Sequence, residues 1–217
     1  MTFTDILLRL LQGASHTVLI TITCSITGLL VGLIIVGLRR LCLTSLRFLL
    51  DSYAYIFRAI PVLVLLFMVY FGLPMLGLKV TPLVAMNMSL GLIASAYISE
   101  VFRGALDLVD TSEIIAAQSM GMTRAQILMY IEFPQMLRFA FPGLINEFTT
   151  ILKYSPFAYT VGIPEITKQA MTLTATTMRG VEIYFAVGIL YFVIYKTLLM
   201  SLHLLERYFR VPGIVPK

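Results

Sequence analysis

Long apolar runs separated by short polar segments make up most of the chain. A run of about 20 apolar residues is long enough to cross the hydrocarbon core of a bilayer as a helix. By this criterion the pattern predicts five spans, at about residues 18–38, 62–78, 82–102, 141–163 and 183–205. Before the first span, Leu7, Leu8 and Leu11 share one helical face, so residues 1–15 are predicted to lie as a short amphipathic segment in the membrane interface.

Several predicted spans contain residues that affect helix shape or packing. Gly28 and Gly32 have the GxxxG spacing that lets two helices approach closely in lipid. Gly72 and Pro74 interrupt the second span, and Pro156 can kink the fourth. The first span also carries hydroxyl groups that can bond back to helix carbonyls, which favours a packing face over a polar pathway, at Thr21, Thr23, Ser25 and Thr27.

The most hydrophilic ordered segment, residues 110–134, has the pattern of two short helices joined by a tight turn. Asp110 can cap the first helix, with Glu113 at capping-box spacing. Gly121 suits the left-handed position just after a helix end. Thr123 and Gln126 have the capping-box spacing at the start of the second helix, and Pro134 is predicted to end it.

Composition agrees with an integral membrane protein: 59% of residues are hydrophobic, 12% are charged, and mean hydropathy is +0.93. The net charge of +5 could indicate nucleic acid in a soluble protein, but positive charge on cytoplasmic loops explains it more simply. With five spans, one side of the membrane holds most of the basic residues, namely Arg39, Arg40, Arg47, Arg58, Arg103, Arg124, Arg138, Arg207, Arg210 and Lys217. The other side holds only Arg9, Lys79, Lys168 and Arg179. This asymmetry predicts an outside N-terminus, a cytoplasmic C-terminus, and residues 110–134 in the cytoplasm.

No pattern of an enzyme or a metal site occurs in the sequence. It contains no GxxxxGK[ST], HExxH or GxSxG, so neither a P-loop nor a known hydrolase site is expected. The two histidines, His16 and His203, are far apart, and the two cysteines, Cys24 and Cys42, suggest neither a disulfide nor a metal site. The N-terminus lacks a basic region and a small-residue cleavage site, so the first span is expected to be uncleaved.

The fourth span carries the most informative polar residues. Asn146, Thr150 and Lys153 fall on one helical face together with Thr149, and Glu147 lies beside that face. Ionisable groups in a span are costly and usually face a bundle interior or a watery cavity. We therefore expect a substrate path at Asn146, Glu147, Thr150 and Lys153. A purely structural pairing with other spans stays open, above all for Lys153; Glu147 and Lys153 are six apart and should not pair with each other.

The two-helix segment also has an apolar surface, contributed by residues such as Ile114, Ile115, Met120 and Ile127. An apolar surface on a rigid loop predicts a docking site. A DNA-binding helix-turn-helix is not favoured, because Arg124 is the one basic residue of the segment and spans tether both of its ends. A plain helical loop is the remaining alternative.

The same segment resembles the EAA loop of ABC-importer permeases, which reads E-A-A, three residues, G, nine residues, I-x-L-P. Here Ala116, Ala117, Gly121, Ile131 and Pro134 stand at the matching positions. Further stretches are similar to permeases of the polar amino acid (histidine/glutamine) type: Arg58, Pro61, Tyr70-Phe71-Gly72-Leu73-Pro74, Ala96-Tyr97, Glu100-Val101-Phe102-Arg103-Gly104, Asn146-Glu147-Phe148, Leu152-Lys153 and Val161-Gly162-Ile163-Pro164-Glu165.

This resemblance implies an all-α transmembrane protein with an approximately five-helix type I ABC-importer permease fold and one permease domain spanning residues 1–217. It implies a multi-pass protein of the bacterial inner membrane that pairs with a second copy or a paralogue. Two ABC ATPase subunits would bind ATP and dock on Ala116, Ala117, Gly121, Arg124, Ile131 and Pro134. An extracytoplasmic binding protein would deliver a polar amino acid, while this chain would hold no cofactor and would not itself be an enzyme.

Three positions depart from the family pattern. Ile115 stands in place of the motif glutamate, Phe133 in place of its leucine, and Tyr154-Ser155-Pro156 follows Lys153 where Asp-Thr-Ser is usual. A different class of function, an ATP-independent secondary amino acid transporter or channel, would need no docking segment. A membrane scaffold would have little use for Glu147 and Lys153.

Overall fold

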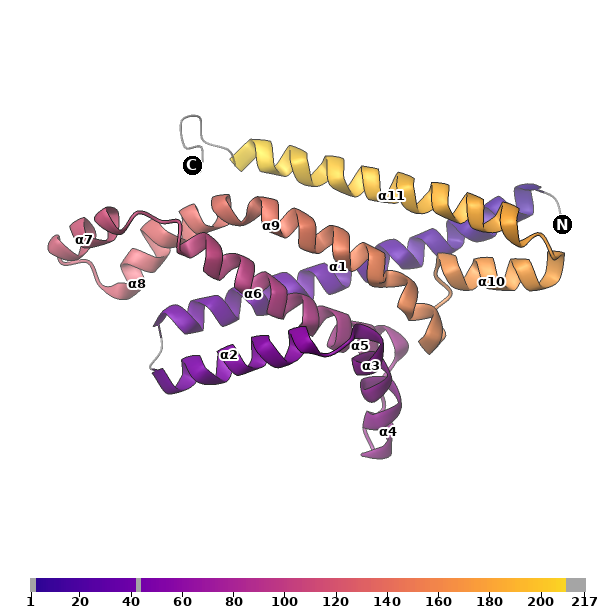
Figure 1. Cartoon of the computed structure of the whole chain (residues 1–217), viewed down its shortest axis with the longest axis horizontal. Helices are drawn as coiled ribbons and strands as arrows, with labels where there is room; N and C mark the ends of the chain where they lie inside the picture. Colours follow the sequence, from indigo (N-terminus) through magenta and orange to yellow (C-terminus); the bar gives the residue numbers. More distant parts are fainter. Residues whose placement is uncertain (1–2, 42–43, 210–217) are drawn as a thin grey trace.

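The computed structural model describes residues 3–41 and 44–209, and every regular element in these ranges is helical. Figure 1 shows long helices lying roughly along one axis: α1 (Phe3–Leu41), α6 (Leu92–Leu106), α9 (Phe133–Tyr154) and α11 (Gly180–Phe209). The all-α prediction is therefore confirmed for the described residues. Cys42, Arg210 and Lys217, which entered the predictions above, lie outside them.

The start of the chain forms one helix with the first span, so the separate interfacial segment predicted for residues 1–15 is wrong. The reason lies in tertiary packing: Ile6 and Leu10 are buried against α10 (Ile166–Thr177) and α11. At Gly13 the backbones come so close that a Cβ atom would lie 2.8 Å from the Cα of Ile166. Ile6 and Leu10 thus join the core, whereas Leu7, Leu8 and Leu11, which were predicted to form the interfacial face, stay exposed on the same continuous helix.

The second predicted span differs most from the structure. An unpredicted helix, α2 (Thr44–Ala59), precedes it, and the chain then turns by 102° between Leu46–Ala59 and Val62–Met75. The turn falls at Pro61, whose backbone is extended (ψ 134) and which has no N–H to continue a helix. Beyond it, α3 (Val62–Phe67), the π-helical turn η1 (Met68–Gly72) and α4 (Leu73–Met75) project sideways (Figure 1). Gly72 and Pro74 therefore do not break this helix; it ends at Met75.

The third span is confirmed and is slightly longer than predicted. It consists of α5 (Pro82–Met86), a π-helical turn η2 (Asn87–Gly91) and α6, a continuous path from Pro82 to Leu106. It packs against the glycine face of α1. A Cβ atom at Gly28 would lie 3.0 Å from the Cβ of Ala94, and one at Gly32 would lie 2.9 Å from Cγ2 of Ile98. The expected close helix approach is confirmed.

The second half of the chain returns along the bundle. After α7 (Thr111–Ser119) and α8 (Arg124–Ile127), a π-helical turn η3 (Leu128–Glu132) leads directly into α9. The expected break near Pro156 is present as a 3₁₀ segment, η4 (Ser155–Val161), followed by Gly162 with φ +93. Then α10 lies at the far end of the bundle from α7 and α8, and α11 runs back (Figure 1).

Three helices among the described residues are long and apolar enough to cross a membrane: Asp5–Leu41, Pro82–Leu106 and Gly180–Arg207. The bent pair Leu46–Ala59 and Val62–Met75 would make a fourth. Helix α9 is 22 residues long but carries Arg138, Glu147 and Lys153. The predicted count of five spans thus remains a prediction.

Candidate functional site

The two-helix segment between α6 and α9 begins as the sequence predicts. The carboxylate of Asp110 accepts a hydrogen bond from the backbone N–H of Ser112 at 2.8 Å, which caps α7 and lowers the pKa of Asp110. Gly121 adopts φ +82 in the turn. The side chain of Thr123 and that of Gln126 form the reciprocal capping box at the start of α8. These devices hold the turn between α7 and α8 in one shape.

Pro134 does not end the second helix, contrary to prediction. Helix α8 continues through η3 into α9, and the N–H of Phe133 bonds to the carbonyl of Leu128, five residues earlier. Pro134 is the second residue of α9 and directly follows this π-helical turn, so the helix continues past a residue that has no N–H to donate. The second helix of the unit is therefore continuous with α9.

Glu113 does not complete a capping box with Asp110. Its carboxylate instead accepts a hydrogen bond from Nε2 of Gln135 at 2.6 Å, which ties α7 to the first turn of α9. Glu113 thus binds a residue of the same chain, two positions before the motif position. The residue at that motif position, Ile115, has 61% of its surface exposed, and Met120 at the end of α7 has 85%. The free face of α7 is apolar at these two residues.

The structure distributes the six proposed coupling residues over the surface and interior of this unit. Ala116, Gly121 and Arg124 are exposed, Ile131 and Pro134 are partly buried, and Ala117 is buried. Ala117 therefore packs inside the unit, and the exposed three are the ones that a partner could reach.

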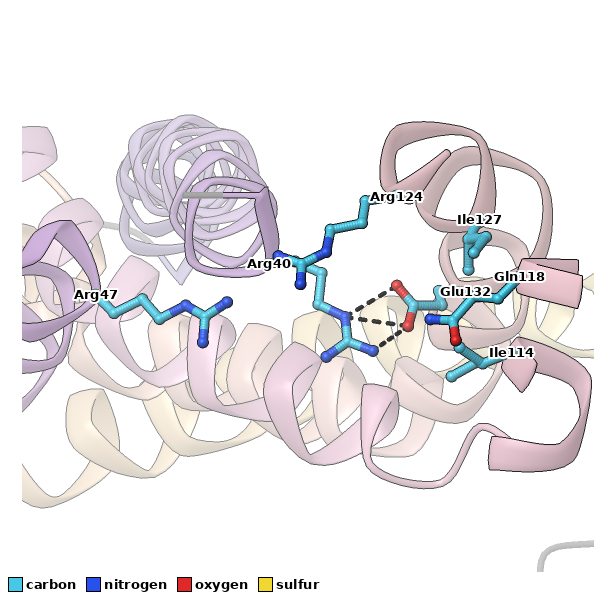
Figure 2. A pocket seen from close by; sticks show the side chains of 7 residues that line it. All are labelled: Arg40, Arg47, Ile114, Gln118, Arg124, Ile127 and Glu132. Atoms are coloured by element: carbon cyan, nitrogen blue, oxygen red, sulfur yellow. Dashed lines mark hydrogen bonds and ion pairs between the residues drawn. The ribbon is translucent and has the colours of Figure 1, made fainter. Parts of the chain in front are cut away.

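A buried ion pair connects the unit to the first helix. Glu132 in η3 is 3% exposed, and both of its oxygens lie 3.0 Å from Nε of Arg40 near the end of α1, with a further contact to Nη2. Beside this pair is a pocket of about 200 Å³ between α1, α2 and the two-helix unit. Figure 2 shows its lining side chains, namely Arg40, Arg47, Ile114, Gln118, Arg124, Ile127 and Glu132.

A second charge cluster lies on α6 at the same end of the bundle. The carboxylate of Glu100 is 3.0 Å from Arg103, as its spacing predicts, and 2.7 Å from Arg39 of α1. Arg58 of α2 is 3.9 Å away. One carboxylate thus holds together three helices, and Arg39 also pairs with Asp51 of α2 at 2.9 Å. The spacing of Glu100 and Arg103 predicts their pair, but sequence reasoning missed the pairs with Arg39, Arg58 and Asp51, since those residues are distant in the chain and α2 was not predicted.

The polar residues of α9 are only partly gathered into one surface. Asn146 and Lys153 are exposed, Glu147 and Thr150 are partly buried, and Thr149 is buried with its hydroxyl donating to the carbonyl of Asn146 at 2.9 Å. Among the described residues neither Glu147 nor Lys153 forms an ion pair, so their predicted failure to pair with each other is confirmed. The ammonium of Lys153 lies 5.7 Å from the ring centroid of Tyr195 on α11.

The hydroxyl groups of the first span belong to helix packing. Thr21, Thr23 and Thr27 donate to carbonyls one turn earlier in α1. Thr23 also accepts a bond from the side-chain amide of Asn87 at 3.2 Å, and Thr27 donates to the oxygen of that amide at 3.2 Å. These bonds satisfy the polar groups between α1 and η2, which favours the packing interpretation.

At the opposite end of the bundle, Glu165 is fully buried and caps α10. Its oxygens accept bonds from the N–H groups of Thr167 and Lys168, both at 2.8 Å, and from the hydroxyl of Tyr191 at 3.0 Å. No ion pair offsets its charge among the described residues. Burial therefore raises the pKa of Glu165, although these hydrogen bonds oppose the shift. The sequence offered only its match to the family pattern as a signal for this residue.

In the part of the chain that the structure describes, no three acidic, histidine or cysteine side chains come together as a metal site would require. Cys24 is buried with a free thiol. The groups available for chemistry are therefore the charged and amide side chains described above, which can bind and orient a polar molecule or a partner protein.

Comparison with known proteins identifies several similar chains. The sequence profile described as "Binding-protein-dependent transport system inner membrane component" matches residues 25–211. The chain is 35% identical over 188 residues to the probable amino-acid permease protein YxeN of Bacillus subtilis (strain 168), covering 85% of this chain and 84% of that protein. It is 33% identical over 199 residues to the histidine/lysine/arginine/ornithine transport system permease protein HisQ of Escherichia coli (strain K12), covering 85% and 86%.

Among solved structures, chains of ABC transporters are similar to this chain. A chain from the crystal structure of an amino acid ABC transporter with histidines superposes with a TM-score of 0.85 at 30% identity, covering 96% of this chain and 99% of that one. A chain of the inward-facing MetNI methionine ABC transporter superposes with a TM-score of 0.82 at 21% identity, covering 97% and 100%, and thus shares the fold.

Proposed function

The chain belongs to the family of binding-protein-dependent transport system inner membrane components, and from this premise we propose that it is the transmembrane subunit of an ATP-driven ABC importer for polar amino acids. The observation that carries the proposal is the two-helix unit of residues 110–134. It is capped at both helix starts, turned on Gly121, fixed to α1 by Arg40–Glu132, and continuous with the polar helix α9.

This unit has the properties of a lever. A partner ATPase would dock on its exposed surface, around Ala116, Gly121 and Arg124, with Ala117, Ile131 and Pro134 supporting that surface from within. Closure of two ATPase subunits on ATP would move α7, and the uninterrupted path from α8 to α9 would carry the movement into the bundle. ATP binds the partner in this proposal, so the chain needs no cofactor of its own.

The proposed contact on α7 is apolar where the family motif has glutamate. Ile115 and Met120 are exposed, and the carboxylate of Glu113 accepts a hydrogen bond from the side chain of Gln135. We therefore propose that the ATPase surface opposite Ile115 is an apolar pocket, whereas in the family motif a glutamate would make the contact at this position.

The proposed topology has five spans in a single domain of residues 1–217, with the N-terminus outside and the C-terminus in the cytoplasm of a bacterial inner membrane. The three apolar helices, the bent pair and α9 would be these spans. Its support is the clustering of Arg39, Arg40, Arg47 and Arg103 around pockets at the end of the bundle that carries α7 and α8. A second permease copy or a paralogue, surrounding lipid and an extracytoplasmic binding protein complete the proposed assembly.

The proposed substrate path runs along α9, at Asn146, Glu147, Thr150 and Lys153. Glu147 has no cationic partner among the described residues and can meet an ammonium or a cationic side chain of the substrate. The relative HisQ has a name that specifies histidine, lysine, arginine and ornithine, which supports a cationic or polar amino acid as cargo.

Uptake by vesicles tests the proposal. The chain would be reconstituted with its ATPase and binding protein, and uptake of labelled polar amino acids would be measured with ATP, without ATP, and with an ATPase variant that cannot hydrolyse it. We expect uptake only with ATP and the active ATPase. Uptake that persists without both would instead identify an ATP-independent secondary transporter or channel.

A further inference from the structure

The pocket beside the Arg40–Glu132 pair carries an excess of positive charge. Three arginines line it, from α1 (Arg40), α2 (Arg47) and α8 (Arg124), and Glu132 is its one acidic lining residue. Glu132 is already bound by Arg40. In Figure 2 the side chains of Arg47 and Arg124 extend toward Arg40 from opposite sides. The space between α1, α2 and the two-helix unit therefore suits an anion.

Two of these guanidinium groups, those of Arg47 and Arg124, have no hydrogen-bond or ion-pair partner among the described residues. Asp51, one helical turn after Arg47, does not neutralise it, because Asp51 pairs with Arg39 at 2.9 Å. Each free guanidinium has a fork of N–H donors that matches the oxygens of a phosphate group.

The positive region continues into an adjoining pocket of about 220 Å³, which Arg40 and Arg47 also line together with Arg39 and Arg103. The side chain of Arg39 is only 9% exposed, and its buried Nε has no hydrogen-bond partner in the described chain. Asp51 and Asp107 line this second pocket as well. Arg39, Arg40 and Arg103 are paired with carboxylates, so Arg47 is the arginine of this second pocket that has no ion pair among the described residues.

An exposed apolar surface begins directly after Arg47. Along α2, Phe48 is 72% exposed, Leu49 62% and Ile56 51%. Phe48, Tyr55 and Ile56 also line a shallow groove of about 330 Å³ on this helix, together with Asp51 and Ser52. A basic pocket next to an exposed apolar helix face is complementary to an amphiphile. The pocket can bind a negatively charged head, and the helix face can contact hydrocarbon tails.

We propose that the pocket binds the phosphate headgroup of an anionic membrane lipid, whose acyl chains lie along the exposed face of α2. Arg47 and Arg124 supply the free donors, and Arg40 stays with Glu132. Arg124 also belongs to the proposed docking surface, but its side chain extends into the pocket. The lipid is placed in the cytoplasmic leaflet, a detail that rests on the proposed orientation; the binding itself does not depend on the transport function. A headgroup held between Arg47 and Arg124 links α2 to α8, so it would fasten the two-helix unit to the bundle.

Native mass spectrometry of the purified full-length chain in non-ionic detergent tests this site. Dioleoyl phosphatidylglycerol and dioleoyl phosphatidylcholine share their acyl chains and differ in headgroup charge, and each would be titrated separately. The variant Arg47→Gln/Arg124→Gln removes the two free guanidiniums. Its matched control is Arg207→Gln, an exposed arginine on α11 that forms no ion pair among the described residues.

We expect tight retention of phosphatidylglycerol over phosphatidylcholine by the native chain. The double variant should weaken phosphatidylglycerol binding roughly 30-fold, about fivefold per arginine, with phosphatidylcholine binding unchanged as evidence of an intact fold. The Arg207→Gln control should bind as the native chain does. Equal binding of both lipids, an equal loss in Arg207→Gln, or displacement of the lipid by millimolar inorganic phosphate would each overturn the assignment. Failure of uptake in the vesicle experiment would leave this result unaffected, so the two proposals can fail separately.

Discussion

Nε of Arg40, near the end of the first helix, lies 3.0 Å from both carboxylate oxygens of Glu132, a residue 92 positions later in the chain. Glu132 is buried, whereas the side chain of Arg40 is 46% exposed. The pair therefore ties the two-helix unit to α1, in addition to its continuity with α9.

Arg40→Gln should destabilise the protein by about 2–3 kcal/mol, because it leaves the carboxylate of Glu132 buried without its charged partner. Glu132→Gln should cost less, since Arg40 can turn toward solvent. In the double variant Arg40→Gln/Glu132→Gln, two amides can bond to each other and part of the loss should be recovered. Thermal unfolding of the three variants in detergent measures this coupling; additive losses in the double variant would mean that the pair does not stabilise the unit.

Gly121→Val should abolish most ATP-driven uptake while leaving ATP hydrolysis and membrane insertion intact. Gly121 has φ +82, a left-handed conformation that costs a residue with a Cβ atom about 1–2 kcal/mol. The turn would then relax and α7 would move relative to α8. Gly104→Val is the matched control, because Gly104 is an exposed helical position with no atom within 4 Å of an added Cβ. Undiminished uptake by Gly121→Val would contradict the proposal that the two-helix unit transmits the movement of the ATPase.

The two-helix unit also shows what local sequence can predict. Asp110, Gly121, Thr123 and Gln126 act within a few residues of their partners, and all four do what their spacing indicates. Pro134 does not, because the helical path continues past it, directly after a π-helical turn whose hydrogen bonds span five residues. Local signals thus predict caps and tight turns, but not whether neighbouring helices merge.

Distance along the chain explains the other differences. Residues 1–15 look like a separate interfacial segment because Leu7, Leu8 and Leu11 share a face, but α10 and α11, more than a hundred residues later, cover Ile6 and Leu10 and join the segment to the core. Helix α2 is too polar to be recognised as a span, and its Asp51 and Arg58 find partners on α1 and α6. The polar residues of α9 could be named from the sequence, yet which of them is exposed depends on packing against α6 and α11.

Glu165→Ala should destabilise the end of the bundle that carries α10 by about 1–2 kcal/mol, a typical cost for loss of a helix cap. The N–H groups of Thr167 and Lys168 and the hydroxyl of Tyr191 would lose their acceptor. The control is Glu182→Ala, since Glu182 is exposed and bonds only to Arg179 on the surface among the described residues. The unfolding temperatures of the two variants measure how much stability each loses. Equal losses would show that the buried cap at Glu165 stabilises the protein no more than the exposed ion pair of Glu182.

The same carboxyl predicts a dependence on pH. Burial raises the pKa of Glu165 above its ordinary value, so the folded protein holds this proton more tightly than the unfolded chain does. The stability that this difference provides is fully present below the ordinary pKa and is lost as pH rises through the raised value. The native protein should therefore lose more stability than Glu165→Gln as pH rises above about 4.5. Parallel curves of unfolding temperature against pH for the two proteins would contradict the shift.

Glu147→Gln should lower uptake of cationic amino acids about tenfold or more and that of neutral polar ones much less. The carboxylate lies partly buried on α9, directly after Asn146 and about one helical turn before Thr150, without a cationic partner in the described chain. A substrate ammonium or guanidinium would supply that partner, and a charged hydrogen bond contributes about 1.5–3 kcal/mol, or at least a factor of ten in affinity. Glu182→Gln at the exposed start of α11 is the control for a simple change of charge. If both variants reduce uptake of lysine and glutamine alike, Glu147 stabilises the bundle and does not select the substrate.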